Sequence, residues 1–108
     1  MLSVKNNIIS ISRGDTGYLD LIIKNPTNPN QIYELRNGDT LVFTLKRTVN
    51  SPDVIIDKEF EGNILKLTEM DTIGLEYGNY SYKVVLYFAN GDTNTIIEPS
   101  VFRVKPGR

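Results

Sequence analysis

The sequence predicts an all-β protein, an antiparallel β-sandwich of about seven to eight strands with Greek-key connections. Apolar and polar residues alternate with a period of two in almost every apolar run, which puts one face of each strand in a core. Turn residues separate these runs, and no long 3.6-residue pattern is present. A chain of 108 residues fits one domain. We therefore expect a single sandwich over residues 1–108.

The expected strands follow one another along the whole chain. In the third of them, Leu41, Phe43 and Leu45 alternate with more polar neighbours, and β-branched and aromatic residues fill the other runs as strands prefer. Only residues 69–76 favour a helical turn, which Thr68 could cap. The strands are expected near 7–12, 17–24, 40–46, 54–60, 63–68, 79–89 and 93–104, with a weaker one at 31–35.

The connections carry clear turn signals. Asn90-Gly91 separates the last two runs, and this dipeptide favours a type I′ hairpin, in which both central residues have positive φ. Asn25-Pro26-Thr27-Asn28-Pro29-Asn30 reads as a loop because proline removes a backbone donor and restrains the preceding residue. Asn50-Ser51-Pro52-Asp53 reads as another. We expect both loops to be exposed.

One tripeptide occurs three times, as Gly14-Asp15-Thr16, Gly38-Asp39-Thr40 and Gly91-Asp92-Thr93. Glycine can close a turn with positive φ, aspartate can accept bonds from nearby amides, and threonine can begin the next strand. The alternative is calcium binding, for which aspartate oxygens are suitable ligands. A calcium loop gathers several ligands within about a dozen residues, whereas these aspartates occur one per turn. We expect structural turns at Asp15, Asp39 and Asp92, and no metal site.

Tyr80 is expected to be structural. It follows Leu75-Glu76-Tyr77-Gly78-Asn79, a spacing similar to the tyrosine corner of Greek-key sandwiches, where the phenol bonds to backbone a few residues upstream. A catalytic tyrosine is the rival interpretation, but the chain has no histidine to act with it. The corner and the hairpin together indicate an immunoglobulin-like Greek key.

The sequence resembles the N-terminal domain of the phage baseplate upper protein family, a module of phage and prophage tails and baseplates. The short matching pieces keep their order over nearly the whole chain, although that domain is typically followed by more chain than the Lys105-Pro106-Gly107-Arg108 ending here. They are Ile11-Ser12-Arg13-Gly14-Asp15-Thr16, Gly38-Asp39-Thr40-Leu41-Val42-Phe43-Thr44-Leu45-Lys46, Leu67-Thr68-Glu69-Met70-Asp71-Thr72, Leu75-Glu76-Tyr77-Gly78-Asn79-Tyr80-Ser81-Tyr82, Asn90-Gly91-Asp92-Thr93 and Phe102-Arg103-Val104.

This resemblance implies an immunoglobulin-like sandwich with an architectural role in a virion, and no catalytic residues. We expect a structural or adaptor protein of a tail, baseplate, neck or capsid-associated complex, made in the bacterial host cytoplasm. Its partners would be other virion proteins and further copies of itself in a homo-oligomer. The alternative is a sandwich whose loops at 25–31 or 47–53 bind a host-surface carbohydrate. Neither loop has an aromatic residue of the kind that sugar sites usually present.

Composition argues against several other classes. The chain lacks cysteine and histidine, so the commonest general base and the best side-chain nucleophile are missing, and we expect no enzyme and no cofactor. The formal net charge of −1 gives no field that would attract nucleic acid. No apolar run approaches the roughly 20 residues of a membrane helix, and the N-terminus has no signal-peptide pattern. The basic groups Lys46-Arg47 and Arg103, Lys105, Arg108 read as solubilising or as contacts for an acidic partner.

Three carboxylates remain to be placed. Asp57, Glu59 and Glu61 follow strand spacing and should project from one face. An acid/base pair is one interpretation. We favour a charged outer row, which protects an edge strand from unwanted pairing.

Some outward positions are apolar as well. Ile22 faces away from Leu21 and Ile23, and Val42, Val85 and Tyr87 also alternate with core residues. Neighbouring strands would make these a patch of the kind that marks interfaces. The alternative is a scatter of single exposed residues, which is ordinary. Our hypothesis is that Ile22, Val42, Val85 and Tyr87 form a subunit contact.

Overall fold

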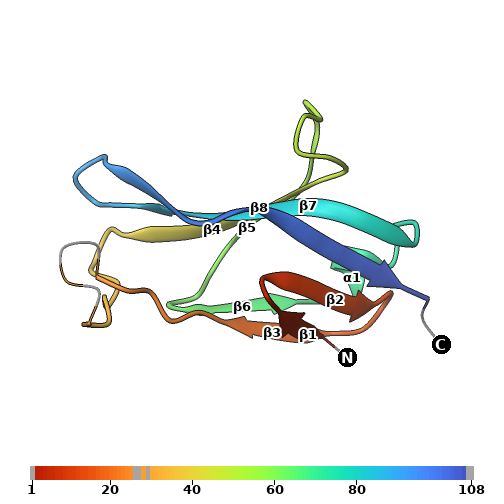
Figure 1. The fold of residues 1–108 in the computed structure, drawn as a ribbon, viewed down its shortest axis with the longest axis horizontal. Coiled ribbons are helices and arrows are strands. Elements are labelled where there is room, and N and C mark those ends of the chain that lie inside the picture. Colours follow the sequence, from red (N-terminus) through yellow and green to blue (C-terminus); the bar gives the residue numbers. More distant parts are fainter. Residues whose placement is uncertain (1, 26–27, 29, 107–108) are drawn as a thin grey trace.

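Two β-sheets face each other in the computed structural model, which describes residues 2–25, 28 and 30–106 (Figure 1). The larger sheet has the strand order β1-β2-β8-β7-β4-β5, and the smaller sheet pairs β3 with β6. The all-β prediction is confirmed. In chain order the elements are β1 (Ser3–Lys5), β2 (Ile8–Ser12), β3 (Gly17–Asp20), β4 (Thr40–Lys46), β5 (Val54–Glu59), β6 (Ile64–Leu67), α1 (Glu69–Thr72), β7 (Gly78–Tyr87) and β8 (Thr93–Lys105).

The strand pairs are antiparallel except for β2 and β8, which run parallel with Ile9 opposite Phe102. The expected alternation is present in the burial of the strands. In β4, for example, Leu41, Phe43 and Leu45 are almost completely buried and the residues between them are partly exposed. The larger sheet therefore has one core-facing side and one outer side.

The centre of the core is a group of three aromatic rings on neighbouring strands. Phe43 of β4 and Tyr82 of β7 stack with centroids 5.6 Å apart, and Phe102 of β8 packs edge-on against both. Aromatic pairs in these geometries add about 0.5–1.5 kcal/mol to the energy of burial. The smaller sheet closes this core from the other side with Leu19, Leu65 and Leu67.

A hairpin that the sequence did not reveal begins the fold. β1 and β2 are joined by the two residues Asn6 and Asn7, with φ of 52° and 65°, and Lys5 is paired with Ile8. Two central residues with positive φ are what a type I′ turn requires. The hydroxyl of Tyr82 donates a hydrogen bond to the carbonyl of Asn7, which fixes this hairpin to the aromatic core.

The hairpin between β7 and β8 is confirmed, but its predicted type I′ turn is wrong. A type I′ turn needs positive φ at both Asn90 and Gly91. Only Gly91 has positive φ, at 95°, and Asn90 does not. Gly91 N–H donates to Phe88 O and Phe88 N–H to Asp92 O, as in a three-residue loop that ends in a glycine bulge. The Asn90 side chain accepts a bond from Asp92 N–H at 2.9 Å, which supports this loop.

Two other expected strands differ from the structure. The run at 17–24 is a strand only to Asp20, and the weaker run at 31–35 forms a single bridge between Ile32 and Lys24. That segment instead packs through Tyr33, whose ring meets Phe88 edge-on at 5.7 Å. In this segment the packing of the Tyr33 ring therefore outweighs the strand propensity of residues 31–35. In the loop expected at 25–30, Pro26, Thr27 and Pro29 lie outside the described residues.

The helical turn expected within 69–76 is present as α1, and Thr68 is its N-cap residue. The carboxylate of Asp71 accepts bonds from the backbone N–H of Thr68 at 2.7 Å and from its hydroxyl at 3.2 Å. Lys58 of β5 reaches the same carboxylate at 2.7 Å. This ion pair connects the edge of the larger sheet to the turn that follows the smaller one.

Tyr80 has the geometry expected of a tyrosine corner. Its ring is buried, and its hydroxyl donates to the carbonyl of Glu76 at 2.8 Å. The guanidinium of Arg47 covers the ring, with its carbon 4.6 Å from the centroid. The bond joins the loop before β7 to the first core residue of that strand.

Replacing Tyr80 with Phe should lower the free energy of unfolding by about 1 kcal/mol, because it leaves the Glu76 carbonyl without this donor. Urea unfolding followed by circular dichroism measures the change. Tyr18→Phe is the matched control, since Tyr18 is 61% exposed and the loss of its hydroxyl should change little. Equal effects of the two substitutions would contradict a structural role for the Tyr80 hydroxyl.

Candidate functional site

The outer side of the larger sheet carries three of the four residues of the hypothesised contact. Val42 and Val85 are directly opposite each other on β4 and β7, and Tyr87 lies one outward position further along β7. Tyr87 is 45% exposed, whereas Val85 is only 9% exposed among its neighbours. These three residues, Val42, Val85 and Tyr87, are called the outer-face patch here. Its solvent-accessible part is mainly Tyr87, together with Val42.

The structure does not bring Ile22 to this patch. Ile22 follows β3 in the other layer, and at 74% exposure it faces away from the core on the outside of the smaller sheet. There it shares a face with Tyr18 and Ile64, which are also exposed. Sequence alternation could have pointed to Tyr18, but only the sheet assignment shows that these three residues lie together.

Charges on the outer side of the larger sheet are sorted by strand. Register places five cationic side chains on this side, on strands β1, β8, β7 and β4, whereas the anionic residues Asp57 and Glu59 both lie on β5. Glu98 falls in the irregular stretch of β8, where its carbonyl accepts a bond from Ser100. The five cationic residues are Lys5, Lys46, Lys83, Arg103 and Lys105.

The three carboxylates that follow strand spacing, Asp57, Glu59 and Glu61, lie along and just after β5, which forms one edge of the larger sheet. All three are exposed, and Thr44 donates a bond to Asp57 at 3.3 Å. Lys58 points the opposite way, toward Asp71. This is the arrangement of a charged outer row on an edge strand.

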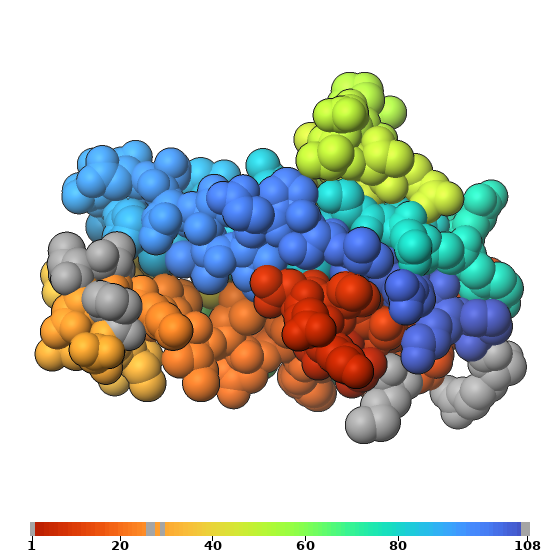
Figure 2. Space-filling view, viewed as in Figure 1, coloured from red at the N-terminus to blue at the C-terminus, as the bar shows by residue number. Residues whose placement is uncertain are grey.

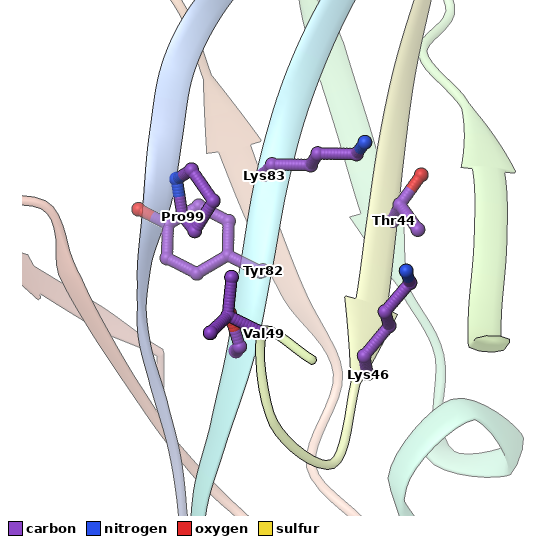
Figure 3. A pocket seen from close by; sticks show the side chains of 7 residues that line it. Thr44, Lys46, Val49, Tyr82, Lys83 and Pro99 are labelled. Atoms are coloured by element: carbon purple, nitrogen blue, oxygen red, sulfur yellow. The ribbon is translucent and has the colours of Figure 1, made fainter. Parts of the chain in front are cut away.

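A shallow depression of about 70 Å³ lies on the same side, where the loop between β4 and β5 stands above the sheet (Figure 3). That loop projects from the body of the molecule and is exposed as expected (Figure 2). Val49 and Pro99 form apolar walls, and Lys46 and Lys83 flank the hollow. Thr44 and Ser81 add hydroxyl groups. The depression therefore combines two lysines and two hydroxyl side chains with apolar walls.

The three Gly-Asp-Thr turns share one backbone feature. Gly14, Gly38 and Gly91 have φ of 86°, 93° and 95°, which confirms the role expected for glycine. A β-carbon at Gly38 would lie 2.8 Å from that of Ala89, so larger residues are excluded by contact as well. Thr40 and Thr93 begin β4 and β8, and Thr16 directly precedes β3.

Asp39 does more than close its own turn. One carboxylate oxygen accepts bonds from the Tyr33 hydroxyl at 2.5 Å and from Arg36 N–H at 3.0 Å, and the other accepts from Ala89 N–H at 3.0 Å. The hydrogen bond from Tyr33, together with those from Arg36 and Ala89, lowers the pKa of Asp39. Asp39 thus joins the segment before β4 to the β7–β8 hairpin.

The basic groups are partly engaged with aromatic rings. Besides Arg47 over Tyr80, Arg13 lies over Tyr77 with its guanidinium carbon 4.7 Å from the ring centroid. Arg103 donates to the side chain of Asn79 at 3.1 Å. Arg108 of the expected basic tail lies outside the described residues.

The described part of the chain has three further properties, which concern metal ligands, an ionisable hydroxyl and membrane spans. It contains no group of three or more acidic, histidine or cysteine side chains placed to hold a metal ion. Burial raises the pKa of Tyr82 to about 12, so this hydroxyl stays protonated and donates to Asn7. No helix among the described residues has the length and apolar character needed to cross a membrane.

No family model, curated protein or solved structure matches this chain.

Asp39 makes a testable contribution to the pH dependence of stability. Its pKa is lower in the folded chain than its ordinary 3.8, so its bonds stabilise the fold above that pH and are lost as the pH falls through the folded value. We expect the free energy of unfolding to decrease below about pH 4, and Asp39→Asn to make this decrease shallower.

Urea unfolding at a series of pH values measures the effect. Tyr33→Phe removes the hydrogen bond that lowers the pKa of Asp39 most. This substitution should therefore also make the loss of stability at low pH shallower, but less so than Asp39→Asn. If the wild-type and Asp39→Asn curves differ only by a constant offset, Asp39 has no linkage of this kind.

Proposed function

We propose that this protein is a structural or adaptor component of a phage or prophage virion that acts through protein–protein contacts and self-assembly. The sequence resemblance to the baseplate module supplies the virion context. The outer side of the larger sheet supplies the contact surface. Its copies would work in the assembled particle after synthesis in the bacterial cytoplasm.

The strand pairing supports an immunoglobulin-like interpretation of the sandwich. Such domains pair strand B with E in one sheet and C, F and G in the other, with C′ beside C in variable-type domains. Here β3 pairs with β6, and β5, β4, β7 and β8 follow one another in the larger sheet. The tyrosine corner at the start of β7 agrees with strand F of that scheme. We assign the Greek-key connectivity on these grounds.

The outer-face patch is the observation that carries the proposal. Val42 and Val85 are cross-strand neighbours, and Tyr87 presents an exposed aromatic ring beside them. Tyrosine is enriched at interfaces because its ring buries a large area while its hydroxyl can still find a partner. Thr40 and Thr93 lie opposite Tyr87, and Thr95 lies opposite Val85. These hydroxyl side chains supply the polar rim that interfaces usually have.

The test replaces the two accessible residues of the patch. We expect the wild-type chain to sediment as an oligomer, and Val42→Lys with Tyr87→Lys to shift it toward monomer, because buried unpaired ammonium groups are costly. Met70→Lys is the matched control, since Met70 is 80% exposed on α1, outside the outer-face patch. Far-ultraviolet circular dichroism should keep its β signal in both variants. A double variant with unchanged mass would exclude this face as the contact.

Binding of an acidic carbohydrate is the second candidate function, and the depression beside the β4–β5 loop favours it. Lys46, Lys83, Thr44 and Ser81 offer charged and hydroxyl groups that could bind a sugar carboxylate or sulfate. A glycan array screened with the wild-type chain and with Lys46→Ala plus Lys83→Ala separates the two functions. A monomer that binds acidic glycans only with both lysines present would favour this second function.

A further inference from the structure

We propose that the two open edges of the larger sheet, β5 and β1, pair with each other between copies of this chain. The occupant of the β5 edge is therefore β1 of a second copy. The contact is heterologous, so repeating it would build a ring or a filament. The inference rests on the proposed function in taking self-assembly as its premise, and it concerns a different surface from the outer-face patch.

The backbone of β5 is set up to accept another strand. Phe60 N–H donates to Leu41 O of β4, and Glu61 N–H donates to Ile64 O on the opposite side. Successive residues of a strand direct their backbone groups to alternate sides, so those of Asp57 and Glu59 point away from β4. β5 ends the sheet, and these groups therefore face its open edge. Donors and acceptors in this alternation match the backbone of an extended polypeptide.

β1 offers the matching edge at the other end of the same sheet. Lys5 and Ile8 close the two-residue turn and bond to each other, so the backbone groups of Val4 point away from β2. The Val4 side chain is 48% exposed. At the opposite edge Val54 and Ile55 of β5 are exposed as well. Each edge thus presents apolar surface beside free backbone groups.

The charges of the two edges are opposite. Ser3 and Lys5 project from the outer side of β1, and Asp57 and Glu59 project from the outer side of β5. Joining the edges in one continuous sheet would place Lys5 beside these carboxylates. Pairing β5 with β5 would instead place like charges opposite one another, which destabilises cross-strand pairs. Charge therefore favours the head-to-tail contact over the symmetric one.

The direction of the strands and the space beside β5 agree with this arrangement. Four of the five steps from β1 to β5 are antiparallel and one is parallel, so β1 and β5 run in the same direction. A copy rotated about an axis along the strands would place its β1 parallel to β5. A groove of about 360 Å³ is lined by Lys58 and Glu59 of β5 and by Ile64 and Lys66 of β6, so there is space beside this strand.

A charge exchange tests the contact by sedimentation of the full chain. Lys5→Glu alone, or Asp57→Lys with Glu59→Lys, should weaken self-association about tenfold or more, because like charges would then meet at the joined edges. Combining Lys5→Glu with Asp57→Lys and Glu59→Lys should restore much of the association. Lys24→Glu with Glu34→Lys is the matched control, since these exposed residues belong to neither β1 nor β5.

The absence of cysteine from the chain allows a direct second measurement. Neighbouring strands of a sheet lie about 4.7–4.9 Å apart, which is within the Cα separation of about 4.4–6.8 Å that a disulfide spans. Chains with Lys5→Cys, mixed with chains carrying Asp57→Cys or Glu59→Cys and oxidised gently, should form mixed disulfide dimers in one of the two pairings. Dimers of Lys5→Cys chains with themselves should be the minor product.

The outcomes separate this inference from the proposed function. An oligomeric wild-type chain with no response to the charge exchange, or with only like-to-like disulfides, would overturn the edge pairing and leave self-assembly standing. A wild-type chain that stays monomeric up to millimolar concentration would overturn both. Rescue by the combined charge exchange together with mixed disulfides would support the edge pairing.

Discussion

The interaction on which this fold most depends is the packing of Tyr82 at the middle of the larger sheet. Its ring stacks on Phe43 and meets Phe102, so three central strands share one aromatic core. Its hydroxyl bonds to the turn at Asn7, 75 residues away in sequence. One side chain thereby joins the first hairpin of the chain to its last strands. The phenol can do this because a buried hydroxyl that has a partner costs little, whereas one without a partner is expensive.

The unequal size of the two sheets determines what remains available for contacts. Two short strands, β3 and β6, cover one side of a six-stranded sheet, so the larger sheet keeps a whole outer side and both of its edges exposed. The Lys58–Asp71 ion pair joins β5, at one edge of the larger sheet, to α1 after the smaller sheet. The outer side and the edges of the larger sheet are therefore exposed in this chain.

The sequence predicted much of the fold but only part of the candidate site. Alternation identified β4 and β7 because each buries one face along most of its length, whereas in β8 only Phe102 and Val104, near the end of the strand, are buried. β1 was missed because Ser3-Val4-Lys5 is too short and polar to show a period. The turn at Asn90 differed from the prediction because its side chain accepts a backbone bond from Asp92. Ile22 was grouped with Val42 and Val85 because alternation shows which way a residue faces but not which sheet holds its strand. Strand pairing between distant segments depends on tertiary packing that local patterns do not encode.

The parallel pairing of β2 with β8 gives the fold a mechanical property. Once the short β1 hairpin is peeled away, tension between the start of β2 and the end of β8 acts along the two strands in opposite directions. Their evenly spaced backbone bonds are then loaded in shear and resist together, whereas strands that unzip yield one bond at a time. A domain built in this way can bear longitudinal force between its two ends without first losing its aromatic core.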